Sequence, residues 1–156
     1  MSTQPGIRVD AEWGCLEEAI VGDSRDVVIA EWHEPYHSTF GENVNDWYRR
    51  NGGTRLDAAD PALAARMITQ QDELARVLAA AGVVVHRVES LRGTADERFL
   101  TDSGEGMLTF PRDPVIVVDD IVIEASPKHR WRRRERYAIR PILERRMAVP
   151  VQPVTR

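Results

Sequence analysis

The sequence is poor in cysteine and in long apolar runs. Cys15 is the single cysteine, so no disulfide can form within the chain, and we expect a reducing, cytoplasmic setting. Apolar runs such as Val115–Val118 extend over only a few residues, whereas a membrane-spanning helix needs about 20. The first residues have neither a basic region nor an apolar stretch. We therefore expect no signal peptide and no contact with a membrane.

A large net charge is also missing, because the chain carries only −4. The charge is unevenly spread, however: residues 128–156 hold 10 of the 21 Lys and Arg but 2 of the 25 Asp and Glu. Such a basic segment can bind nucleic acid, or it can be neutralised by another part of the same fold. The chain as a whole is acidic and has no further basic patch. We therefore favour neutralisation and do not expect nucleic acid as a partner.

The length of 156 residues, 42% of them hydrophobic, fits either one domain over residues 1–156 with a packed core or an incomplete piece of a larger domain. Two polar, glycine-bearing stretches, 31–60 and 89–106, show no sustained periodicity. We expect both to be long loops, which are commonly functional or disordered. The first of them can hold a short helix near Val44–Arg49.

Helix signals are clear in two places. Asp60 suits an N-cap and Pro61 the first helical position, and apolar residues at helical spacing then extend to Gly82, which suits a stop. This pattern predicts a helix over Pro61–Ala81. A second helix with one apolar face is predicted over about Trp131–Met147, and Pro141 should kink it or begin its second half.

Short strands are predicted around these helices. Two β-branched runs joined by two acidic residues predict a hairpin. Helices mixed with short strands favour an α/β or α+β fold. The four expected strands are Cys15–Val21, Val83–Val88, Val115–Val118 and Ile121–Ala125; weaker candidates are Asp26–Ala30 and Val149–Val154.

Most candidate reactive groups have a simple structural interpretation. His33 and His37 have the spacing of a helical zinc site, but Pro35 between them disfavours the helix, so we expect a surface loop and no metal. Cys15 is followed by Glu17 and Glu18, and nearby carboxylates disfavour a reactive thiolate. A free, buried or half-buried structural cysteine is the favoured interpretation. No glycine-rich phosphate loop is present.

Asp113 is the most distinctive candidate. It lies between Pro111 and Pro114, just before an apolar strand, where a rigid backbone can hold a carboxylate that binds a planar cation through both oxygens. The alternative is a structural turn in which Asp113 pairs with Arg112 or caps a backbone amide. The spacing alone favours the turn.

Three segments, taken together and in order, resemble the amidinotransferases that move an amidino group from arginine. The first is Glu12–Gly22, EWGCLEEAIVG, and the second lies within 72–87 and includes LAAAGVVVHR. The third is the most specific: Pro111-Arg112-Asp113, then IVIEA at 121–125, then Arg130-x-Arg132-x-x-Glu135-x-x-Ala138-x-Arg140-x-Ile142. The resemblance covers residues 12–143, and these correspond to the N-terminal part, less than half, of the family's length.

The resemblance implies a partial pentein, or α/β propeller, with about two of that fold's five ββαβ-type repeats. It places Asp113 on the guanidinium of arginine or another guanidino compound, with Arg112 as a neighbouring substrate-binding motif residue. It implies no cofactor and no metal. The family's cysteine nucleophile, histidine acid/base and further acidic residue lie beyond the matched region, and Cys15 does not match the nucleophile. The isolated chain is therefore expected to be inactive.

Three functions remain open from the sequence. The first is an amidinotransferase-like protein, either a fragment or a short natural homologue. The second is a non-catalytic partner or binding subunit of a guanidino-modifying enzyme, and the third is a nucleic-acid-binding protein. A partial propeller also leaves an open flank, so we expect an exposed apolar face and association with a second copy or a complementing chain.

Overall fold

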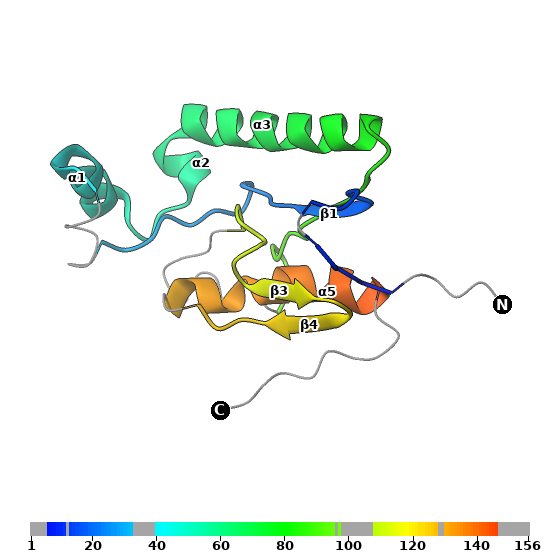
Figure 1. Cartoon of the computed structure of the whole chain (residues 1–156). Helices are drawn as coiled ribbons and strands as arrows, with labels where there is room; N and C mark the ends of the chain where they lie inside the picture. The colour runs from blue at the N-terminus through cyan, green and yellow to red at the C-terminus, as the bar shows by residue number, and fades with distance from the viewer. Residues whose placement is uncertain are drawn as a thin grey trace.

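The computed structural model describes residues 6–11, 13–32, 40–95, 97, 108–127 and 130–146. Among the described residues, one strand is followed by three helices, three strands and two further helical segments, and the strands form two separate two-stranded sheets (Figure 1). The elements are β1 (Glu18–Val21), α1 (Glu42–Asn51), α2 (Leu56–Ala59), α3 (Pro61–Ala80), β2 (Val84–Arg87), β3 (Val115–Val118), β4 (Ile121–Glu124), the 3-10 helix η2 (Arg130–Arg134) and α5 (Arg136–Arg146).

The first sheet pairs β1 with β2 in parallel, and Ile20 is the register partner of His86. The long helix α3 precedes β2 and contacts both strands (Figure 1). Its start is fixed as the sequence predicts, because the Asp60 carboxylate accepts a hydrogen bond of 2.8 Å from the Leu63 amide. Gly82, with a φ of +88°, ends it. The helix predicted over Pro61–Ala81 is confirmed, one residue shorter.

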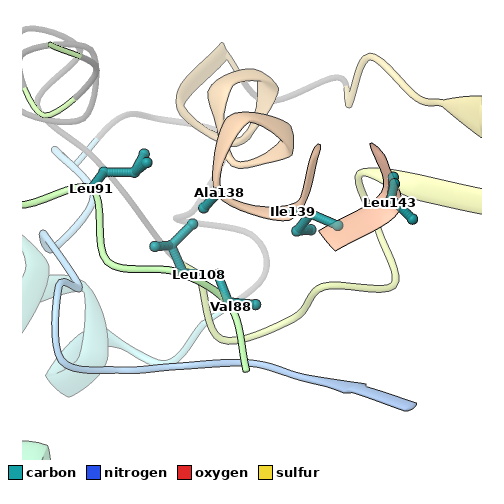
Figure 2. Close-up of a cluster of buried hydrophobic side chains, with 6 residues drawn as sticks. All are labelled: Val88, Leu91, Leu108, Ala138, Ile139 and Leu143. Atoms are coloured by element: carbon teal, nitrogen blue, oxygen red, sulfur yellow. The ribbon is translucent and has the colours of Figure 1, made fainter. Parts of the chain in front are cut away.

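The second sheet is the antiparallel hairpin of β3 and β4, in the register Val115↔Glu124 and Val118↔Ile121. Asp119 supplies the left-handed turn residue, with a φ of +54°. The inner face of the hairpin packs on α5, which Figure 1 draws behind it. The core at this contact, shown in Figure 2, consists of Val88, Leu91, Leu108, Ala138, Ile139 and Leu143.

The outer face of the same hairpin is apolar and exposed. Ile116 and Val118 on β3 are 49% and 56% exposed, and their register partners Ile123 and Ile121 on β4 are 41% and 59% exposed. Four aliphatic side chains therefore share one uncovered sheet face. This confirms the exposed apolar face expected from the sequence.

The prediction that residues 31–60 form a long loop is wrong over much of its length. Helix α1 covers ten residues, more than the short helix expected near Val44–Arg49, and α2 follows it. Asn45 stabilises the start of α1 from the interior, since it is fully buried, accepts a hydrogen bond from the Trp32 indole and donates one to the Phe40 carbonyl. The full length of α1 could not be predicted from the sequence, because its N-cap residue, Gly41, has no side chain that could cap the helix.

Other boundaries also differ from expectation. No strand forms over Asp26–Ala30, where Val28 makes only an isolated bridge to Arg55. The helix predicted from Trp131 begins as the 3-10 helix η2, and α5 then continues past Pro141, so Pro141 does not begin a separate helix. Strand β1 starts three residues later than predicted. The strand expected at Val149–Val154, the pair His33 and His37, and most of 89–106 lie outside the described residues.

The two halves of the chain meet where β1 ends. A Cβ on Gly22 would lie 2.2 Å from the Thr109 carbonyl oxygen, so only glycine permits this approach. The next residue, Asp23, donates its amide to the Leu108 carbonyl at 3.1 Å. The backbone that leads to Asp113 is thereby fixed against β1. Within the described part of the chain, every helix is too short or too polar to cross a membrane.

Candidate functional site

Asp113 lies two residues before β3, in a turn where its amide donates to the Phe110 carbonyl at 3.4 Å. The following residue, Pro114, is fully buried, so the backbone on that side is held in the interior. The Asp113 side chain itself is 50% exposed. Its carboxylate pairs with Arg132 rather than with Arg112, so the turn pair that the sequence allowed does not form.

Arg132 connects Asp113 to the interior. Its Nη1 donates to Asp113 Oδ2, while its Nε donates to both carboxylate oxygens of Glu135 at 3.2 Å and its Nη2 to Glu135 Oε2 at 2.9 Å. Nη2 also reaches the Phe110 carbonyl at 3.3 Å. Glu135 is 1% exposed. Burial works to lower the pKa of Arg132, but hydrogen bonds to Glu135 and Asp113 outweigh it and raise that pKa above its ordinary value.

A second carboxylate near this turn is fully enclosed. Glu124, at the end of β4, is 3% exposed and binds the Arg140 guanidinium in bidentate fashion, at 2.8 and 2.6 Å. Arg136 approaches the same carboxylate at 3.9 Å. The hydrogen bond to Glu124 raises the pKa of Arg140, against the opposing effect of burial. This pair is built as a structural ion pair, with no exposed oxygen for a ligand to approach.

The arginine-rich segment is neutralised by carboxylates from distant parts of the chain. Besides the contacts above, Arg145 pairs with Glu89 at 2.7 Å and Arg146 pairs with Glu18. The favoured interpretation of the uneven charge is thus confirmed for these arginines. The absence of a nucleic-acid partner stays a prediction.

The remaining candidates are placed as follows. Arg112 is exposed beside Asp113, and its role stays a prediction. Cys15 is exposed, just ahead of β1, so the buried or half-buried position expected from the sequence is wrong. Within the described ranges, no three histidine, cysteine, aspartate or glutamate side chains are grouped so that they could hold a metal ion.

Sequence reasoning missed the partner of Asp113. The Arg132–Glu135 contact has a local signal, since residues three apart on a helical turn are neighbours. The Arg132–Asp113 contact spans 19 residues and depends on how η2 packs against the turn before β3. No local pattern reports such a contact.

Comparison with curated proteins gives consistent relatives, although no family model matches the chain. The mitochondrial glycine amidinotransferase of Danio rerio is 28% identical over 134 residues, which are 85% of this chain and 31% of the relative. The L-arginine:L-lysine amidinotransferase of Pseudomonas savastanoi pv. phaseolicola is 31% identical over 134 residues, which are 85% of this chain and 36% of the relative. The chain thus spans about a third of the length of these relatives.

A solved structure has the same fold. SxtG, an amidinotransferase of the saxitoxin biosynthetic pathway from Microseira wollei, matches with a TM-score of 0.69 over 89% of this chain and 40% of its own. Its sequence identity is 24%, so this structural likeness shows the α/β fold and nothing about function. The resemblance seen in the three motifs is therefore confirmed: the chain is related in sequence and in fold to the amidinotransferases.

Proposed function

We propose that this chain supplies the guanidinium-binding part of an amidinotransferase-like protein, which transfers the amidino group of arginine to an acceptor amine. The proposal rests on the exposure and the hydrogen bonding of the Asp113 carboxylate. Its carboxylate is half-exposed and already holds one guanidinium, that of Arg132, through Oδ2. None of the described residues donates a hydrogen bond to its other oxygen, Oδ1. A ligand guanidinium can therefore bind there.

The chemistry proposed for the complete protein is covalent. A cysteine thiolate attacks the guanidino carbon of arginine, ornithine leaves, and the amidino-thioether is then attacked by the acceptor amine. Asp113 would fix the plane of the guanidinium, and such orientation lowers the barrier by several kcal/mol in comparable reactions. The resemblance does not match Cys15 to the family nucleophile, so in this proposal the thiolate comes from sequence other than this one. The isolated chain then binds arginine without turning it over.

We further propose that the chain forms about two repeats of a five-repeat propeller within one domain. In the complete assembly, the exposed hairpin face of Ile116, Val118, Ile121 and Ile123 would be covered by further repeats, by a second copy or by a complementing chain. This face also favours the second candidate function, a non-catalytic partner subunit. The two candidates separate when the chain is mixed with a complementing chain, because only the first predicts ornithine release that depends on Asp113.

Calorimetric titration tests the proposed site. L-arginine is titrated into the wild type, into Asp113→Asn and into Asp120→Asn, a matched change at an exposed aspartate of the same hairpin. L-citrulline, which has the same shape without the guanidinium charge, serves as the control ligand. We expect Asp113→Asn to weaken arginine binding by at least about tenfold, the loss of one charge-assisted hydrogen bond, and Asp120→Asn to leave it unchanged. Equal arginine affinity in Asp113→Asn and the wild type would refute the site.

A further inference from the structure

We propose that Arg132 is a positioning residue for the guanidinium site: it holds Oδ2 of Asp113 and so presents Oδ1 to the ligand. The inference rests on the proposed function, because it presumes that Asp113 binds a guanidinium. It adds to the proposed site a residue, Arg132, that lies in η2 and outside the turn before β3. Three features of the structure support it: how Arg132 is anchored, what it fixes in Asp113, and the charge that the cluster keeps.

Arg132 is anchored away from the site. Three of its hydrogen bonds go to Glu135, which is 1% exposed, and one goes to the Phe110 carbonyl. Arg132 itself is 15% exposed. Pulling it off would take three hydrogen bonds from the buried Glu135 carboxylate, and breaking a buried ion pair is strongly unfavourable. An incoming ligand therefore meets an Arg132 that stays in place.

Arg132 fixes what the backbone leaves free in Asp113. Pro111 and Pro114 restrict the backbone on either side, and Pro114 is buried. Among the described residues, the Asp113 side chain is held by the hydrogen bond from Arg132 Nη1 to Oδ2. With both in place, Oδ1 has one orientation before the ligand arrives. Preorganisation of this kind strengthens binding because less freedom is lost on association.

The three paired residues carry one net negative charge between them. Arg132 is positive, and Asp113 and Glu135 are negative. Asp113 is the exposed carboxylate of the three, and the neighbouring Arg112 is exposed as well. A lysine in place of Arg132 would keep the positive charge but could not bridge both carboxylates, because its single nitrogen lacks the fork of a guanidinium.

Arg132→Lys is therefore the informative variant. Arg133→Lys is its matched control, since Arg133 is exposed in the same η2 helix and donates to the Pro127 carbonyl instead. We expect Arg132→Lys to weaken L-arginine binding about fivefold or more and Arg133→Lys to bind as the wild type does. In an Asp113→Asn background, Arg132→Lys should produce no further loss, because the two residues act as one unit. Additive losses would overturn the inference.

A measurement on the wild type remains decisive even if Arg132→Lys does not fold. The Nη–H signals of Arg132 are followed by ¹⁵N-edited NMR while L-arginine is added, because Nη1 donates to Asp113 Oδ2. A positioning residue keeps a protected Nη1–H signal at saturation. Loss of that protection would mean that arginine displaces Arg132 from Asp113, which would overturn the inference.

The outcomes also separate this inference from the proposed function. If Asp113→Asn weakens arginine binding but Arg132→Lys does not, the proposed site stands and the role of Arg132 is refuted. If the wild type and Asp113→Asn respond equally to arginine, both fail together. A loss of L-citrulline binding equal to that of L-arginine in Arg132→Lys would indicate general damage to the fold and would also refute positioning.

Discussion

Two carboxylates, Asp113 and Glu124, lie at the same end of the β3–β4 hairpin. Each pairs with an arginine, but they differ in burial. Glu124 is the register partner of Val115, and the Ala125 amide donates to the Pro114 carbonyl at 2.9 Å, so the turn that carries Asp113 lies alongside. Each carboxylate is held by an arginine from the segment that follows the hairpin. Glu124 is 3% exposed, however, whereas Asp113 is 50% exposed.

We expect this difference in burial to separate a structural carboxylate from a ligand-binding one. Glu124 uses both oxygens on Arg140, so its removal leaves a partly buried guanidinium without its partner. Asp113 uses one oxygen, and an exposed ion pair adds little to stability. Pairing between arginine and a carboxylate is thus expected to stabilise the fold at Glu124 and to leave Asp113 available to a ligand. Four substitutions test this contrast.

The largest expected loss of stability comes from a substitution at Gly22, which lies against the backbone that leads to Asp113. In Gly22→Ala, the new Cβ would lie 2.2 Å from the Thr109 carbonyl oxygen and 2.6 Å from its carbonyl carbon, so the backbone before Asp113 must shift. We expect a loss of about 3 kcal/mol in the free energy of unfolding, measured with urea. Gly14→Ala is the control, since its nearest neighbouring atom is 3.6 Å away. Equal stability of the two variants would contradict the close approach at Gly22.

The second effect concerns the buried pair alone. Glu124→Gln should lower the free energy of unfolding by about 2 kcal/mol, because Arg140 keeps its charge and loses a charged partner. Glu17→Gln, at an exposed position just before β1, is the control and should leave unfolding unchanged. A Glu124→Gln variant as stable as Glu17→Gln would show that the Glu124–Arg140 pair does not stabilise the fold.

The third substitution, Asp113→Asn, should change the free energy of unfolding little and arginine binding strongly. Asp113→Asn should change the free energy of unfolding by less than about 1 kcal/mol, because the side chain is half-exposed and its ion pair is screened. Chemical denaturation of this variant beside Glu124→Gln checks the order of the two. A larger stability loss in Asp113→Asn than in Glu124→Gln would make Asp113 a structural residue.

The smallest effect extends the contrast to a fully solvated pair. Glu73 and Arg76 on α3 lie 2.6 Å apart with side chains 55% and 67% exposed. The hydrogen bond from Arg76 lowers the pKa of Glu73, so any stabilisation from the pair is present above the unfolded-state pKa and lost as the pH falls through the folded-state pKa. Arg76→Gln should raise the Glu73 pKa, followed by carboxyl NMR, without moving the unfolding midpoint at neutral pH. An unchanged Glu73 titration would contradict this pairing.

The sequence predicted those features whose causes are local. The helix α3 carries its own cap at Asp60 and its own stop at Gly82, and the hairpin consists of two β-branched runs around a tolerant turn residue, Asp119. Helix α1 was missed because its stabilising residue, Asn45, acts through tertiary contacts with Trp32 and Phe40.

The candidate site was predictable in part for the same reason. The two prolines around Asp113 mark a rigid turn in the sequence, and the motif resemblance points to its carboxylate. The partner Arg132 and the burial of Glu135 follow from the packing of η2 against that turn, which periodicity and spacing do not encode. The contrast between Asp113 and Glu124 likewise depends on which face of the hairpin turns inward.

Amide chemical-shift mapping of the wild type with L-arginine compares the two carboxylates in one experiment. The account predicts saturable shift changes at Asp113 and Arg132, with Glu124 and Arg140 unaffected, because arginine binds at the exposed carboxylate and leaves the buried pair intact. Shift changes centred on Glu124 and Arg140, or no saturable change at Asp113, would contradict the claim that exposure of Asp113 makes it the guanidinium-binding residue.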